Sequence, residues 1–317
     1  MSEKLEPGRQ RATDPDRVRR ILSLRNRAAD AVRDFFSSHG FLAADTPVRV
    51  QAPANEDHID AFTADGRYLR TSPELEMKRL LAAGCERIYQ LGPCFRQGER
   101  GNRHLPEFTM LEWYRAGADY IDVLHDAHGL LLHVCRACLG TACCTFRGGQ
   151  IDFAAPWQQL SVDDAFAAHA RVSPDEAVEK GMFEEVLVDE VEPHLCGEAP
   201  VVLCDYPSAI RTLAAVKPEA PGRAQRWELY AGGMELANAC TELTDPQEQR
   251  RRFAAARRFR ETQNRAAYPV DEHYMNALEQ GLPPSAGVAL GFDRLLILLT
   301  DAPSIDDIVL FPAPHAR

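Results

Sequence analysis

Four side chains with ligand-binding chemistry share one face of a predicted strand over residues 108–114. Because side chains alternate between the two faces of a strand, Phe108, Glu112 and Tyr114 project together, with Met110 among them. The other face carries Leu111 and Trp113 and better suits the packed side. The face with the carboxylate and the phenol is either a binding surface or one that only meets solvent.

Two glutamates lie on a predicted β-hairpin whose turn is Gly232-Gly233, a pair that supplies the positive φ values of a tight turn. This turn pairs Tyr230 with Glu235 and Glu228 with Ala237, so Glu228 and Glu235 become diagonal neighbours on one face. Two carboxylates that close repel each other unless a cation lies between them. Mg²⁺ bound by carboxylates and substrate phosphates fits this requirement, and two independent surface glutamates are the alternative.

Basic side chains gather in the loop after Phe95, namely Arg96, Arg100, Arg103 and His104. Arg294 lies in the first turn of a helix that is predicted to follow Gly291. Arginine forks and helix N-termini both suit phosphate oxygens. A solvated loop would have a similar composition, but the combination with the glutamate hairpin favours a nucleoside triphosphate bound with Mg²⁺.

Hydrophobic periodicity, helix caps and turn residues predict the helices and strands that position these residues. Asp14-Pro15 begins a helix that ends at Gly40, Ser72-Pro73 begins one that ends at Gly84, and residues 121–139 form a third. Residues 87–95 and 108–114 form a long-looped antiparallel pair. Later elements are a long Arg-rich helix capped at Asp245, a strand over 287–290, a helix from Phe292 and a final strand over 308–311. Hairpin-linked strands with helices around them predict an antiparallel α+β domain.

The chain has 317 residues and a formal net charge of −11, with 36 Lys+Arg against 47 Asp+Glu. Binding to nucleic-acid backbone depends on clustered Lys and Arg, so this balance argues against it as the main function. The basic run over residues 9–33 is interpreted as a solvated helix face. We find no secretory signal and no apolar stretch near the roughly 20 residues of a membrane span, and we therefore expect a cytoplasmic protein with reduced cysteines.

The cysteines offer a competing interpretation. Cys135 and Cys138, with Cys143, Cys144 and His133 nearby, provide the residue types of a zinc site. However, Cys135 and Cys138 are one turn apart in an apolar helical run, where free cysteines commonly pack into cores. Buried thiols are therefore the preferred interpretation.

Several motifs resemble those of class II aminoacyl-tRNA synthetases, in the form found in lysyl-tRNA synthetases. Phe95-Arg96, Arg103-His104 and residues 106–114 together resemble motif 2, residues 287–294 resemble motif 3, and Phe41 to Pro47 resembles the motif 1 strand. Residues 71–80 (TSPELEMKRL) and 235–242 (ELANACTE) are similar to two further signatures of the lysyl enzymes. The resemblance spans nearly the whole chain and implies a class II catalytic fold, an antiparallel sheet flanked by helices.

Lysyl-tRNA synthetases of this form carry an N-terminal anticodon-binding barrel, a domain-sized unit of roughly a hundred residues. Only residues 1–13 precede the first predicted helix here. The resemblance therefore implies the branch without the barrel, the elongation factor P (R)-β-lysine ligases, to which residues 106–115 and 235–238 are also similar. We expect a flexible tail over 1–13 and a catalytic domain over 14–317, with a helical insertion over 145–200.

The resemblance also implies roles for individual residues. Arg96 and Arg294 would bind the ATP phosphates, Phe108 would stack on adenine, and Glu228 with Glu235 would hold Mg²⁺. Glu235 would also line the nucleotide, and the remaining ATP contacts would come from Gln97, Gly98, Glu99, Arg103, His104, Leu236 and Gly291. Gly98 stands where the family usually has glutamate, and Glu99 could substitute for it.

For the amino-acid substrate, the resemblance implies two groups of contacts. Ser72, Pro73, Glu74 and Glu112 would face an amino group near the reacting end, and Asn238 would face the carboxylate. Tyr114 and Glu242 would bind the distal ammonium. Ala237 and Ala289 both stand where lysyl-tRNA synthetases usually carry glycine, which implies a pocket reshaped for a β-amino acid.

The expected function is an ATP-dependent ligase that activates (R)-β-lysine, or lysine, as an adenylate and transfers it to a lysine ε-amine of elongation factor P. The resemblance also implies a homodimer built through the helix and strand over residues 18–47. The alternatives are a truncated synthetase that acts on tRNA, which the acidic balance disfavours, and a catalytically inactive regulator. Retention of Arg96, Glu228, Glu235 and Arg294 argues against the inactive regulator.

Overall fold

The computed structural model describes residues 14–210 and 213–312 of the chain. The tail expected over residues 1–13 lies outside the described residues. No helix in the described ranges is both long enough and apolar enough to cross a membrane.

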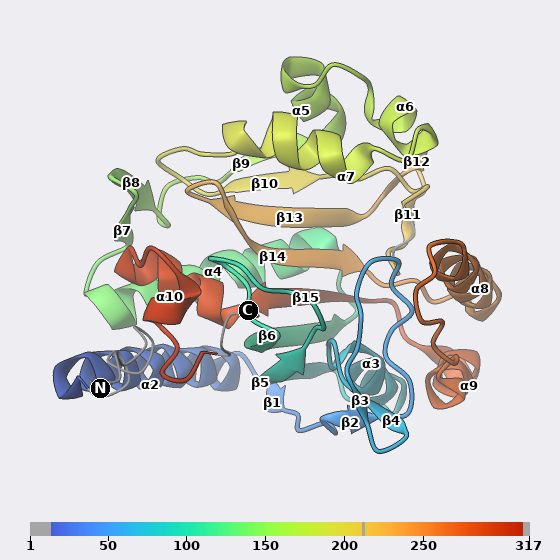
Figure 1. The fold of residues 1–317 in the computed structure, drawn as a ribbon, viewed down its shortest axis with the longest axis horizontal. Helices are drawn as coiled ribbons and strands as arrows, with labels where there is room; N and C mark the ends of the chain where they lie inside the picture. Colours follow the sequence, from blue (N-terminus) through green and yellow to red (C-terminus); the bar gives the residue numbers. More distant parts are fainter. Residues whose placement is uncertain (1–13, 211–212, 313–317) are drawn as a thin grey trace, which may run out of the picture.

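An eight-stranded sheet in the order β1-β5-β6-β15-β14-β13-β10-β9 forms the centre of the described molecule (Figure 1). Its strands are β1 (Leu42–Ala43), β5 (Arg87–Phe95), β6 (Glu107–Ala116), β15 (Ser285–Gly291), β14 (Met234–Thr241), β13 (Arg226–Ala231), β10 (Val201–Cys204) and β9 (Gln158–Ser161). The central strands are antiparallel, whereas the edge strands β1 and β9 pair in parallel with β5 and β10. The α+β fold is confirmed, but the expectation of an antiparallel sheet is wrong at both edges, because long connections there permit parallel pairing.

Helices α2 (Pro15–Ser38), α4 (Tyr120–Leu139) and α10 (Phe292–Thr300) bury the apolar face of the sheet. As predicted, α2 begins after Asp14, whose side chain accepts hydrogen bonds from the amides of Asp16 and Arg17. Leu111 and Trp113 are fully buried in this core, which confirms their assignment to the packed face. The face with Glu112 is therefore left for a site.

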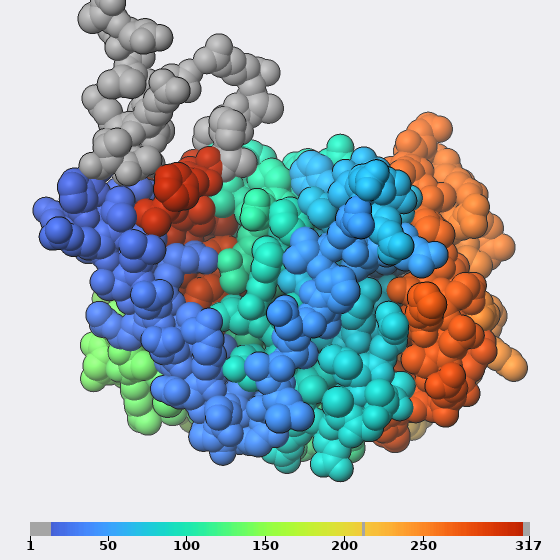
Figure 2. All heavy atoms as spheres, turned by 90° about the horizontal axis from the view of Figure 1, so that it is seen from below, coloured from blue at the N-terminus to red at the C-terminus, as the bar shows by residue number. Residues whose placement is uncertain are grey.

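Helices α3 (Glu74–Ala82), α8 (Pro246–Thr262) and α9 (Glu272–Gly281) pack at one end of that second face. Apolar side chains of these helices form a core with Ile88 and Tyr114 of the sheet. A small sheet of β2 (Arg49–Val50), β4 (Arg67–Leu69) and β3 (Thr63–Ala64) lies between α2 and α3 in the chain. Figure 2 shows this side of the molecule, with α2 in dark blue at one end and the orange α8 and α9 segment at the other.

The segment over residues 145–200 is only partly helical. It begins with a hairpin of β7 (Cys143–Phe146) and β8 (Gly149–Asp152), and β9 then joins the main sheet. The helical part consists of α5 (Val162–His169), α6 (Pro174–Glu179), α7 (Phe183–Val186), the π-helical turn η1 (Leu187–Val191) and the 3₁₀ turn η2 (Glu192–His194). The expectation of a helical insertion is wrong before residue 162, because four-residue strands are too short to reveal their period.

The remaining elements are short. Strands β11 (Val216–Lys217) and β12 (Ala220–Ala224) pair with each other, and the 3₁₀ turn η3 (Ile305–Asp307) follows α10. The strand expected over residues 308–311 is wrong, since no strand is described there. Ile305 and Ile308 are instead buried in the core that includes α10, which accounts for their apolar character without a sheet partner.

Candidate active site

A cavity of about 480 Å³ opens on the sheet face opposite α2, α4 and α10. Its floor includes Glu112 on β6, Ala289 on β15 and Asn238 on β14, which are direct cross-strand neighbours. Phe108, Met110 and Tyr114 also line the cavity. The predicted strand face therefore forms part of a concave site rather than a surface that only meets solvent, and Glu112 is 1% exposed.

A β-bulge in the Gly-Gly hairpin decides which side chains of β14 reach the cavity. Ala231 pairs with Met234 and Tyr230 with Glu235, as predicted, but the register then shifts and Glu228 pairs with Asn238. The predicted pairing of Glu228 with Ala237 is therefore wrong. One extra residue reverses the alternation, so Glu235 and Asn238 share a face although they are three positions apart.

Ala237 consequently lies on the other face of β14, between Leu229 and Leu290 in the main core. Its assignment to the substrate pocket is wrong, because the bulge turns its methyl group toward the helices. Ala289 keeps its place on the floor between Glu112 and Asn238. Only one of the two alanines can therefore shape the pocket.

The carboxylate of Glu112 is held by two hydroxyl groups. Ser72 Oγ donates to Glu112 Oε1 at 2.6 Å, and Tyr114 OH donates to Glu112 Oε2 at 3.0 Å. Burial raises the pKa of Glu112 to about 8, and the two hydroxyl donors oppose this rise. A cationic group placed beside Glu112 would favour its charged form.

Glu242, expected to meet a distal ammonium, already has a cationic partner within the protein. Lys78 on α3 contacts the carboxylates of both Glu242 and Glu74, the latter at 2.5 Å from Nζ to Oε1. Lys78 is 1% exposed, and although burial lowers its pKa, the two carboxylates outweigh burial and raise it. Two carboxylates sharing one lysine leave net negative charge at this end, which suits a second cation.

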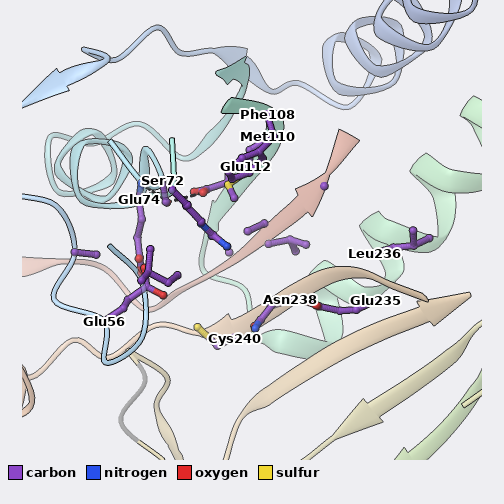
Figure 3. Close-up of a pocket in the computed structure, with 18 of the residues that line it drawn as sticks. Glu56, Ser72, Glu74, Phe108, Met110, Glu112, Glu235, Leu236, Asn238 and Cys240 are labelled. Carbon is purple, nitrogen blue, oxygen red and sulfur yellow. Dashed lines mark hydrogen bonds between the residues drawn. The ribbon is translucent and has the colours of Figure 1, made fainter. Parts of the chain in front are cut away.

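Glu228 is the centre of a hydrogen-bond network that includes Asn238, which lies beside Glu235 in Figure 3. Arg226 Nη2 donates to Glu228 Oε1 at 2.5 Å, and Asn238 Nδ2 donates to the same oxygen at 3.2 Å. The hydroxyl groups of Tyr206 and Tyr230 donate to Oε2 at 2.6 and 2.7 Å. Arg226 Nε also donates to Asn238 Oδ1 at 3.3 Å, so the network holds both polar atoms of the Asn238 amide.

A cluster of cations lies at the other end of the cavity. Arg294, in the first turn of α10, donates from Nη1 to the backbone oxygen of Glu235 at 2.9 Å and to its Oε2 at 3.0 Å. Arg294 also contacts His104, whose pKa is lowered by burial and by the adjacent guanidinium. Arg103 donates to the backbone oxygen of Gly233 at 3.2 Å. These groups and the helix N-terminus suit anionic oxygens.

Arg96 completes this end, with its guanidinium 5.2 Å from the centre of the Phe108 ring. Glu99 is its acidic neighbour, 3.6 Å from Oε1 to Nη1. Gly98 adopts a φ of +83°, which favours glycine over glutamate at this position. Arg100, by contrast, forms two hydrogen bonds with Asp306 and does not line the cavity, so the basic loop of the sequence is divided between two locations.

The donor set fits Mg²⁺ only partly. In the described part of the chain, Glu235 accepts from Arg294 at one oxygen, and its Oε1 is left without a donor. Both oxygens of Glu228 each accept two hydrogen bonds, so an ion at Glu228 would have to displace one of those donors. Mg²⁺ commonly takes one or two carboxylates plus phosphates and waters, and Glu235 fits such a ligand better than Glu228.

Several expected contacts are not brought to the cavity. Pro73, Gln97 and Gly98 lie in the adjoining loops without lining it, whereas Ser72, Glu74, Leu236, Gly291 and Glu242 do line it. No group of three or more His, Cys, Asp or Glu side chains in the described ranges is arranged to hold a metal ion. Cys135 and Cys138 are free thiols buried in the main core, which confirms the prediction of buried thiols at these positions.

Sequence reasoning missed Lys78, Arg226 and Glu56, all of which belong to the site or its support. Lys78 is four residues after Glu74 on the buried side of α3, so a charged residue on an apolar helix face was an available signal. Arg226 is two residues before Glu228 on the same strand face. Glu56 lies in an irregular loop, where no periodicity indicates its direction.

Comparison with known proteins places these features in a family. The family model described as tRNA synthetases class II (D, K and N) matches residues 9–315. The chain is 37% identical to the lysine–tRNA ligase of Moorella thermoacetica, 36% to that of Carboxydothermus hydrogenoformans and 34% to that of Bacillus subtilis. These matches cover 95%, 95% and 96% of the chain but 66% of each relative, so the chain spans just under two thirds of their length.

Proposed function

The chain belongs to the class II tRNA synthetases of the D, K and N group, and we propose that it is an ATP-dependent ligase for a lysine-type amino acid. The observation that carries this proposal is one continuous cavity with two chemically distinct ends. Arg96 and Arg294 line one end, and Glu74, Glu112 and Glu242 contribute to the other. A triphosphate suits the first end, and an amino acid with two ammonium groups suits the second.

The reaction has two steps. An oxygen of the amino-acid carboxylate attacks the α-phosphorus of ATP, and the bond to pyrophosphate breaks to give an aminoacyl-adenylate. An amine then attacks the acyl carbon, the bond to AMP breaks, and the amine proton leaves to solvent. Arg96 and Arg294 would orient the phosphates and offset the developing charge, and Asn238, held by Glu228, would orient the carboxylate. Mg²⁺ bound at Glu235 would supply further charge neutralisation.

For the acceptor, we propose a lysine ε-amine of elongation factor P, and for the amino acid (R)-β-lysine. The acidic net charge of −11 favours a protein acceptor over a nucleic-acid backbone. Ala289 on the pocket floor favours an amino group moved away from the α-carbon, since its methyl group occupies space that glycine would leave open. The names of the relatives support tRNA as the other candidate acceptor.

The acceptor is tested by incubating the purified protein with ATP and either (R)-β-lysine or L-lysine, once with elongation factor P and once with tRNA. The proposal expects the intact mass of elongation factor P to rise by one lysyl residue, with no acid-stable charging of tRNA. Charging of tRNA without a change in the mass of elongation factor P would contradict the proposal and identify tRNA as the acceptor. An absence of ATP–pyrophosphate exchange with every amino acid would support the inactive regulator.

Ala289→Gly is expected to shift the amino-acid preference toward L-lysine. The parent should activate (R)-β-lysine faster, and a misfit of one methyl group is worth about 1–3 kcal/mol, or roughly 10- to 200-fold. Ala237→Gly is the matched control, because Ala237 faces the core and should leave the preference unchanged. Specificity constants from adenylate-formation kinetics decide the matter, and equal constants for both lysines in the parent would contradict the β-lysine assignment.

We also propose that the protein is a homodimer that associates through the surface of α2 and β1. Leu22 on α2 and Leu42 on β1 are 45% and 65% exposed, and association through this surface would remove their side chains from water. β1 is also an edge strand of the sheet, with unpaired backbone groups. Light scattering at micromolar protein should give twice the chain mass of 35.3 kDa, and a monomer mass would contradict this proposal.

A further inference from the structure

A loop over residues 54–62 passes beside the cavity and is fixed from behind by one buried arginine. Arg260 on α8 is fully buried, and its guanidinium donates to the backbone oxygens of Glu56 and Ile59, each at 2.8 Å. Arg260 also pairs with Asp60 at 2.5 Å, and the amide of Ala61 donates to Tyr268 OH at 2.7 Å. The backbone of this loop is therefore held in place without using the Glu56 side chain.

The Glu56 side chain lines the cavity and is half-buried. Figure 3 shows it on the same side of the pocket as Glu74, which projects toward the same space from the start of α3. Burial raises the pKa of Glu56 to about 7, Arg96 opposes this rise, and the carboxylates of Glu74 and Glu99 add to it. Glu56 thus lies within electrostatic reach of Arg96 and Glu99 at the phosphate end and of Glu74 at the substrate end.

No hydrogen bond or ion pair of the Glu56 carboxylate is found among the described residues. The other buried or half-buried carboxylates on the described lining have partners: Glu74 and Glu242 contact Lys78, Glu99 contacts Arg96, Glu235 contacts Arg294, Asp293 contacts Arg25, and Glu112 accepts from Ser72 and Tyr114. Asp57 also has an interaction of its own. Glu56 is therefore a half-buried carboxylate on the lining that no described side chain neutralises, and it is available for a ligand.

The chemistry of that ligand follows from the charges around Glu56. A phosphate oxygen would be repelled by the carboxylate, although Arg96 nearby attracts it. An ammonium group placed between Glu56 and Glu74 would offset two negative charges and would lie next to the end where the substrate carboxylate reacts. Glu74 alone would bind the ammonium group less well, since Lys78 already donates to its Oε1.

We infer that Glu56 is a specificity-determining residue that binds the ammonium group nearest the reacting carboxylate of the amino-acid substrate. This inference rests on the proposed lysine-activating function and adds a contact from outside the sheet and the motif-like segments. The Glu56 side chain enters the cavity from a loop, whereas Asn238, which orients the substrate carboxylate, lies on the floor. The separation of Glu56 and Asn238 therefore sets the distance between the substrate's amino group and its carboxylate.

The test compares Glu56→Gln, which keeps size and removes charge, with Glu56→Asp, which keeps charge. Glu179 on α6, an exposed carboxylate that does not line the cavity, provides the control variant Glu179→Gln. ATP–pyrophosphate exchange gives KM for (R)-β-lysine, L-lysine and ATP, and competition gives the inhibition constant of 6-aminohexanoate, which has the distal ammonium but lacks the proximal one.

We expect Glu56→Gln to raise KM for both lysines about 10- to 100-fold, because a charged hydrogen bond to the substrate is lost. KM for ATP and the inhibition constant of 6-aminohexanoate should stay within about twofold of the parent values. Glu56→Asp should recover part of the loss, and Glu179→Gln should match the parent. An equal rise for 6-aminohexanoate, a rise in KM for ATP, or unchanged KM for the lysines would overturn the inference. If the parent activates neither lysine, the proposed function itself fails, which the parent measurement alone reveals.

Discussion

Replacing Arg294 with glutamine is expected to slow adenylate formation by about 10³-fold, in line with the loss of a positioned donor to a phosphoryl group. Arg294 lies in the first turn of α10, and Glu235 holds its guanidinium through both a backbone and a side-chain oxygen. Because the guanidinium is fixed before substrate arrives, little reorganisation is needed when charge develops on the phosphates. The measurement is single-turnover pyrophosphate release with saturating ATP and lysine.

Two further variants separate charge from geometry. Arg294→Lys keeps the positive charge but loses the fork, so its rate should fall between those of the parent and Arg294→Gln. Arg100→Gln is the control, since Arg100 is an arginine of the loop between β5 and β6 that bonds to Asp306 and does not line the cavity. Equal rates in the parent and Arg294→Gln would remove Arg294 from the proposed chemistry.

Gly287→Ala is expected to raise KM for lysine by about 100-fold, as for a displacement of roughly 1 Å within an ordered site. A Cβ at Gly287 would lie 2.2 Å from Tyr114 Cε1 and 2.9 Å from Glu242 Oε1. Tyr114 is 4% exposed and bonded to Glu112, so it cannot move aside without breaking that contact. Overpacking should also lower the free energy of unfolding by about 1–3 kcal/mol.

The control for this substitution is Gly222→Ala, because a Cβ at Gly222 meets no atom within 4 Å. Lysine KM and the urea midpoint of unfolding should be close to those of the parent in that variant. If Gly287→Ala lowers stability but leaves the KM for lysine unchanged, the pocket does not bind substrate at Tyr114 and Glu242. The two readouts therefore distinguish a packing defect from a binding defect.

Much of the fold followed from local patterns. The Asp14 cap and the period of the next residues predicted α2, and the Gly-Gly pair predicted the hairpin turn. The alternation from Phe108 to Tyr114 predicted which side chains of β6 meet a ligand face. Short segments were less predictable. Strands β7, β8 and β9 have four residues each, which is too few for a clear alternation of buried and exposed side chains. The segment that begins at Ile308 is apolar because it packs into the core, and it does not pair with a strand.

The sequence by itself determined the chemical types at the site and the strands and helices that carry most of them, since caps, turns and strand alternation act between residues close in the chain. Only the tertiary structure decided the bulge that places Asn238, and not Ala237, beside Glu228. It also decided that Lys78 meets Glu242 and that Glu56 enters the cavity from a loop fixed by Arg260. These arrangements depend on packing and charge pairing between segments far apart in the chain, which no local pattern encodes.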